Sequence, residues 1–108
     1  MPEKLYQGID QTINSKFFIT FFDPVRFELV NFLSSYEWLN IGEIAENFPQ
    51  DRSVISRHLD QMYQQNILIK EKRSKFIYYQ LNCEYVTKMF ENTSAELRKL
   101  MNTCTSND

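Results

Sequence analysis

The sequence predicts a mainly helical fold with one small β-hairpin. Apolar residues recur at intervals of three or four along most of the chain, which is the spacing of one face of an α-helix. Only two Gly and three Pro residues are present, so the chain has little material for tight turns. Its 108 residues, of which 43% are apolar and 15% aromatic, suffice for a core. We expect a single domain over residues 1–108, with a short flexible tail from about residue 103.

A capping signal separates the first two predicted helices. The first helix covers residues 5–22, and Asp23-Pro24 then supplies an N-cap acceptor followed by proline at the first helical position. The second helix extends to about Ser35. The inward positions of the two helices are Leu5, Ile9, Ile13, Phe17, Phe18, Phe21 and Phe22, and then Val25, Leu29, Phe32 and Leu33.

Two further helices follow an aromatic break at residues 36–39, which is more typical of an extended segment. Residues 41–48 predict a brief helix that Pro49 ends, because proline cannot donate a backbone hydrogen bond. Asp51 is then placed to cap another helix. The inward stripe of that helix is Ile55, Leu59 and Met62. The opposite side carries Arg52, Ser53, Ser56, Arg57 and Asp60.

The last third of the sequence predicts a hairpin and a final helix. Residues 67–72 and 76–81 are the two strands, and polar residues 73–75 connect them. The helix that follows ends near Asn102. Its apolar positions are Val86, Met89, Phe90, Thr93, Leu97 and Leu100. The order of elements is therefore that of a helix-turn-helix with a β wing behind it.

Charge is distributed unevenly along the chain, although the net charge is only −2 and the pI about 5.4. Residues 1–50 carry a net −4, residues 51–82 a net +3 and the remainder a net −1. The basic segment coincides with the capped polar helix and the hairpin. A basic island on an acidic body indicates a surface that attracts phosphates.

The candidate DNA-binding residues lie in this basic segment. Short or bidentate polar side chains on the capped helix suit base edges in the major groove, and Gln61 extends their row by one turn. Long cations on the hairpin suit backbone phosphates or the minor groove. The only histidine, His58, is expected to contact a phosphate or a structural partner. The complete predicted set is Arg52, Ser53, Ser56, Arg57, His58, Gln61, Lys70, Lys72, Arg73 and Lys75.

Other functional classes have little support in the sequence. There is no glycine-rich phosphate loop, no clustered carboxylates and no histidine beside a cysteine or serine, so we expect no enzyme and no cofactor. No window approaches the roughly 20 apolar residues of a membrane span. The two cysteines fit neither a disulfide framework nor a CxxC metal site, and a signal-peptide pattern is missing, so we expect a cytoplasmic protein.

Four segments together resemble the arsenic-repressor (ArsR) family: residues 23–30 (DPVRFELV), 41–45 (IGEIA), 54–59 (VISRHL) and 77–81 (IYYQL). The resemblance spans roughly residues 16–100. It implies a homodimer that is paired through its first and last helices, binds a palindromic operator on double-stranded DNA and represses transcription until an inducer arrives. The sequence differs from the family pattern at the wing turn, where Arg73-Ser74-Lys75 stands in place of a glycine and the hairpin is expected to be one residue shorter.

The metal sites of the family lack their ligands in this chain. The positions that match the cysteine-type site are Asn40 and Gly42. Those that match the last-helix site are Cys83, Tyr85, Glu96 and Lys99, and a lysine ammonium there would repel a cation. We therefore expect no metal site and leave the inducer, or its absence, open.

Two alternatives stay open at this point. Cys83 and Cys104 are about 31 Å apart if they lie in one continuous helix, which excludes an intramolecular disulfide. Antiparallel packing of two last helices would instead bring Cys83 near the partner's Cys104 as a redox link, against two ordinary thiols. The acidic net charge and atypical wing also fit a winged-helix module that binds another protein instead of DNA.

Overall fold

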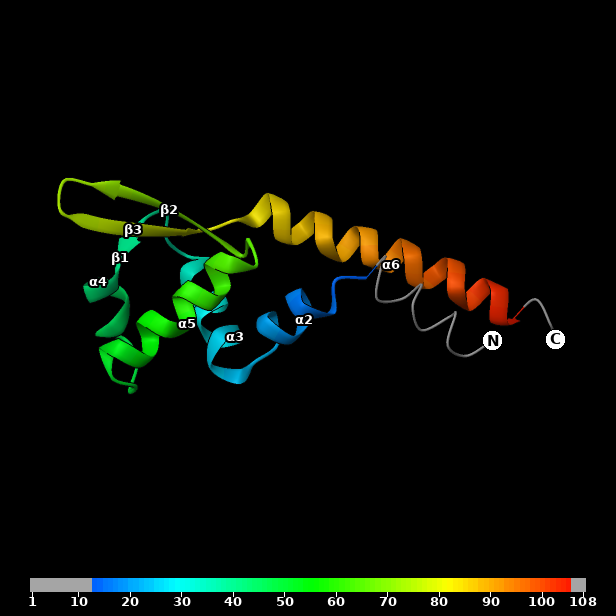
Figure 1. Ribbon diagram of the computed structural model, residues 1–108, viewed down its shortest axis with the longest axis horizontal. Coiled ribbons are helices and arrows are strands. Elements are labelled where there is room, and N and C mark those ends of the chain that lie inside the picture. Colours follow the sequence, from blue (N-terminus) through cyan, green and yellow to red (C-terminus); the bar gives the residue numbers. More distant parts are fainter. Residues whose placement is uncertain (1–12, 106–108) are drawn as a thin grey trace.

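The computed structural model describes the backbone of residues 13–105 and the side chains of residues 13–102. A head of short helices and a small sheet is followed by one long helix that projects from it (Figure 1). The elements are α2 (Ser15–Phe21), α3 (Pro24–Leu33), β1 (Leu39–Asn40), α4 (Ile41–Ala45), α5 (Arg52–Gln64), β2 (Leu68–Arg73), β3 (Phe76–Leu81) and α6 (Cys83–Thr105). The predicted helical fold with a β wing is confirmed.

One apolar core holds the helices of the head together. The fully buried side chains come from α2, α3, α4, α5 and the segment around the start of β2. Burying each of them contributes about 1.5–3 kcal/mol relative to exposure. They include Phe17, Leu29, Ile44, Ile55, Leu59, Met62 and Ile67. The predicted inward stripe of α5 is thus its anchor to the core.

Three helix starts in the head differ in how they are capped. The Asp23 carboxylate accepts hydrogen bonds from the backbone N–H groups of Val25 and Arg26, at 3.1 and 3.2 Å, as predicted. Asn40 and Glu43 form a reciprocal capping box at the start of α4, which the sequence analysis did not include. Asp51 occupies the N-cap of α5, but its side chain makes no capping hydrogen bond.

The sheet has the strand order β1-β3-β2, and both pairings are antiparallel. In the hairpin, Arg73 pairs with Phe76, so the connection is the two residues Ser74 and Lys75. Ser74 has φ 58°, in the left-handed region that favours glycine, and a non-glycine residue adopts it at some cost. The predicted hairpin is confirmed, but its first strand is Leu68–Arg73 and not residues 67–72, so Arg73 belongs to the strand and not to the connection.

Some predicted boundaries were wrong. The extended segment expected at residues 36–39 is a strand only at Leu39–Asn40, because only these residues pair with β3. Helix α4 ends at Ala45 instead of Phe48, and turns lead from there to Pro49. Helix α6 continues to Thr105.

The start of the first predicted helix lies outside the described residues, which begin at Ile13. Within them, helix α2 begins only at Ser15, with Asn14 as its N-cap acceptor for the N–H of Phe17.

Candidate nucleic-acid interface

Helix α5 presents two opposite faces. Ile55, Leu59 and Met62 are fully buried, so the apolar stripe fixes the rotation of the helix about its own axis. The opposite face carries five polar side chains, all of which are exposed. They are Arg52, Ser53, Ser56, Arg57 and Asp60. The structure therefore brings the predicted base-reading residues together on one solvent-facing surface.

Arg26 of α3 connects α5 to the rest of the head. Its Nη1 atom lies 3.2 Å from Nδ1 of His58 and 2.5 Å from the Gln61 side-chain oxygen, and its Nε donates to the Thr20 carbonyl at 2.7 Å. A guanidinium can only donate, so Nδ1 of His58 is the acceptor in this contact. His58 and Gln61 thus have a partner inside the protein, on the flank of the exposed face.

The environment of His58 favours its neutral form. Burial lowers the pKa of His58 below its ordinary 6.5, the positive charges of Arg26 and Arg57 lower it further, and Asp23 partly opposes them. A neutral imidazole is the form that accepts the hydrogen bond from Arg26. The sequence analysis expected a phosphate or structural partner for His58, and the structure provides the structural one.

Three of the four wing cations lie over aromatic rings. Lys70 lies 4.2 Å from the centroid of the Tyr63 ring, and Lys75 lies 5.8 Å from that of Phe76. Arg73 lies over both Trp38 and Tyr78, at 5.0 and 5.2 Å from their centroids. Cation–π contacts at exposed sites contribute about 0.5–1 kcal/mol each.

One of the wing cations also has an acidic partner. Arg73 forms an ion pair with Glu71 at 3.1 Å. Among the described residues, Lys72 alone of the four wing cations has neither a ring nor an ion-pair partner.

The residues that position these side chains are not among those predicted from the sequence. In the sequence, Arg26 stands out only as part of the DPVR segment. Its place directly after a capped helix start is the signal that could have identified it as a positioning residue. Tyr63, on α5, links that helix to the base of the wing through Lys70. Trp38 lies in the loop before β1 and connects this loop to the wing through Arg73.

Some of the positions at which the resemblance implies metal ligands make other contacts. Among residues 13–102, no group of three or more His, Cys, Asp or Glu side chains could hold a metal ion. Asn40 is engaged in the capping box, and Glu96 forms an ion pair with Lys99 at 3.5 Å.

Both cysteines belong to α6, and Cys83 at its first position is exposed. The side chain of Cys104 lies outside those described. In the described part of the chain, no helix has the length and apolarity needed to span a bilayer.

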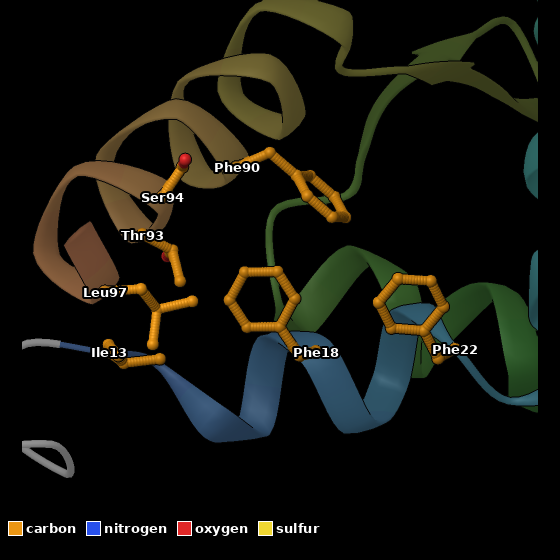
Figure 2. A pocket seen from close by; sticks show the side chains of 7 residues that line it. All are labelled: Ile13, Phe18, Phe22, Phe90, Thr93, Ser94 and Leu97. Atoms are coloured by element: carbon orange, nitrogen blue, oxygen red, sulfur yellow. The ribbon is translucent and has the colours of Figure 1, made fainter. Parts of the chain in front are cut away.

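An apolar hollow of about 500 Å³ lies between α2 and the projecting part of α6 (Figure 2). Phe18 points into it from α2, Phe22 from the residue directly after α2, and Phe90 and Leu97 from α6, as Figure 2 shows. Phe22 and Leu97 are 56% and 41% exposed. Met101, one turn after Leu97 on α6, is 56% exposed. A contiguous apolar surface of this kind marks an interaction site.

Comparison with known proteins gives concordant results. Residues 23–70 match the sequence model of a family described as "Bacterial regulatory protein, arsR family". The transcriptional repressor SdpR of Bacillus subtilis (strain 168) is 33% identical over 60 residues, which cover 56% of this chain and 66% of SdpR, just under two thirds of its length.

Two solved structures share both fold and detectable identity with the chain. One is a possible transcriptional regulator for arsenical resistance, with a TM-score of 0.63 and 26% identity, covering 78% of this chain and 91% of the other. The second is the transcriptional repressor PagR of Bacillus anthracis, with a TM-score of 0.59 and 26% identity, covering 71% of this chain and 85% of PagR.

Proposed function

This chain belongs to the arsR family of bacterial regulatory proteins, winged helix-turn-helix DNA-binding regulators of transcription, and on that premise we propose that it is a homodimeric repressor that binds a palindromic operator. The family consists of regulators and not of enzymes. Two copies of α5 enter successive major grooves, about 34 Å apart, and the wings contact the flanking backbone of double-stranded DNA in the cytoplasm. SdpR and PagR, both named transcriptional repressors, support the direction of the regulation.

The exposed face of α5 is the observation that carries this proposal. Its serine hydroxyls and arginine guanidinium groups can donate hydrogen bonds to base edges, and arginine pairs with two acceptors of guanine. Arg52, Ser53, Ser56 and Arg57 are the base readers, with Gln61 and His58 at the edge of the contact surface. Asp60 accepts only, so it selects for the amino group of cytosine or adenine.

The wing contributes affinity for the duplex more than sequence selection. Lys70, Arg73 and Lys75 are positioned by aromatic rings, and Lys72 is the cation with the greatest freedom to follow a phosphate. Phosphate contacts orient a protein on the duplex without reading its sequence.

A second copy of the chain is the proposed occupant of the apolar hollow between α2 and α6. These are the described parts of the first and last predicted helices, through which the family resemblance pairs two subunits. Burial of Phe22, Leu97 and Met101 against the same residues of a partner would remove large exposed apolar side chains of this face from water.

The decisive experiment is a shift assay with an operator selected from random duplexes by the wild-type chain. Replacing Arg57 by Ala should reduce operator affinity by about 1–3 kcal/mol and relax one base position, since a bidentate contact is lost. Lys72→Ala should weaken binding to operator and random DNA alike. Equal losses on both DNAs for both variants would contradict base readout.

Two further observations would redirect the proposal. Binding that does not weaken as salt rises would favour a protein-binding module over a DNA-binding one. Dimers cross-linked between Cys83 and the partner's Cys104 after mild peroxide would make the regulator redox-responsive, whereas monomers alone in a non-reducing mass spectrum would leave two ordinary thiols. No inducer is assigned, and control by abundance or by a partner protein stays open.

A further inference from the structure

A second hollow of the head lies between α2, α3 and the C-terminal end of α5, and we call it the basic cleft. It has a volume of about 550 Å³. Ile19 is the apolar residue of its lining, and the polar residues are Lys16, Thr20, Arg26, Gln61, Gln64 and Gln65. Helix α2 and the end of α5 lie beside one another at this place (Figure 1).

The basic cleft is lined by positive charges, although the surrounding part of the sequence has a negative net charge. Residues 1–50 hold seven acidic residues and only three basic ones. Two of these three cations, Lys16 and Arg26, lie in the described part of the chain, and both line the cleft. No carboxylate of the described residues lines it. The nearby Asp23 carboxylate is 3.9 Å from Arg26. A concave site with two cations and three carboxamides suits an anion with several oxygen acceptors.

The two cations have different roles in the cleft. Arg26 is largely buried and is engaged with Thr20, His58 and Gln61, so it supplies a fixed positive charge to the wall. Lys16 is exposed, and its flexible ammonium can follow a ligand. Removing Lys16 therefore tests the site without removing a support of the fold.

The cleft adjoins the surface that we assign to the major groove. Gln61 lines the cleft and follows Arg57 by four residues, and Gln64 follows Asp60 by the same spacing. Residues four apart are neighbours on one side of a helix. A helix in the major groove has a row of phosphates on each side, one row from each DNA strand. The C-terminal end of α5 therefore places the cleft beside one of these two rows.

We propose that the basic cleft binds a backbone phosphate of the DNA duplex, with Lys16 as its mobile cation and Gln64 and Gln65 as neutral donors. This inference rests on the proposed DNA-binding function. It extends the interface beyond the helix-turn-helix and the wing to α2, an element that carries none of the base readers. A free phosphate shares the same chemistry, and the experiment below separates the two sources.

The test measures the dependence of DNA affinity on salt for wild type, Lys16→Gln and Lys16→Arg. A phosphate contact releases counterions, so Lys16→Gln should reduce the slope of log K against log salt by about one for each bound protomer, equally on operator and random DNA. Lys16→Arg keeps the charge and should keep the wild-type slope. Lys88→Gln is the matched control, because Lys88 is an exposed lysine on α6 paired with Glu84.

Three outcomes separate this inference from the proposed function. If Lys16→Gln keeps the wild-type slope while Arg57→Ala loses the operator, the phosphate site is refuted and the regulator stands. If the wild type shows no salt-dependent DNA binding, the proposed function itself fails. If inorganic phosphate at matched ionic strength raises the Tm of wild type but not of Lys16→Gln, and the DNA slopes agree, the cleft takes free phosphate and the DNA source is overturned.

Discussion

Helix α5 and the β2–β3 wing are held in the fold by different kinds of contact. The helix is anchored by three fully buried apolar side chains and by the Arg26 guanidinium, whereas the wing cations lie over exposed or half-exposed rings. Core burial contributes several kcal/mol and fixes one orientation, while surface cation–π contacts contribute a fraction of that. The exposed face of α5 is therefore held in one orientation, whereas the wing is only biased toward one geometry.

The strongest way to break this comparison is to remove the anchor of α5. Leu59→Ala should lower the free energy of unfolding by about 2–5 kcal/mol, because it opens a cavity beneath the helix. Urea unfolding measures the change. Ser56→Ala, on the exposed face of the same helix, should stay within about 0.5 kcal/mol of wild type. Equal destabilisation by the two variants would refute the assignment of the faces.

A second variant removes the polar tie between α3 and α5. Arg26→Met should cost about 1.5–3 kcal/mol, since the Thr20 carbonyl, His58 and Gln61 lose a charged donor. It should also raise the pKa of His58, because the positive charge of Arg26 helps to lower it. The His58 resonance followed by NMR over pH 5–8 measures this shift. An unchanged titration would show that Arg26 does not contact the ring in solution.

The wing side of the comparison is tested by a double-mutant cycle. Trp38→Leu and Arg73→Met should show a coupling of about 0.5–1 kcal/mol in the free energy of unfolding, the value of an exposed cation–π contact. The cycle of Trp38→Leu with Lys72→Met should show almost none. A coupling well above that range would make the wing as firmly held as α5.

Acidification should give the smallest effect. The pKa of His58 is lowered in the folded chain, so below pH 6.5 the unfolded chain binds more protons than the folded one. The free energy of unfolding therefore falls as pH falls through the window between 6.5 and the lowered value, and it is insensitive to His58 above that window. Comparing wild type with His58→Gln by thermal unfolding at pH 7 and pH 5.5 isolates this contribution. A pH dependence identical in both proteins would assign it to other groups.

Local signals in the sequence predicted the elements but not the contacts between them. Asp23-Pro24 marked the start of α3, and the spacing of Ile55, Leu59 and Met62 marked the buried side of α5, because both depend on residues within about two turns of one another. Arg26 contacts His58 and Gln61 across 32 and 35 residues of sequence, and no local pattern encodes such a pairing.

The boundary errors have a similar origin. Trp38 was assigned to an extended segment because aromatic residues favour strands, yet only Leu39 and Asn40 find hydrogen-bonding partners on β3. The Asn40-x-x-Glu43 spacing was present in the sequence and would have placed the start of α4. A side chain such as that of Trp38, which ends beneath a distant arginine, is positioned by the completed sheet.

The capping box at the start of α4 has a consequence for how this regulator can evolve. Its acceptor residue, Asn40, lies at a position where the family resemblance implies a thiolate ligand in metal-sensing members. A change of Asn40 to cysteine would remove the acceptor for the Glu43 N–H, so a new thiolate would arrive together with a weakened start of α4, at a cost of about 0.5–2 kcal/mol. A soft-metal ligand at this place would therefore be coupled to the stability of α4.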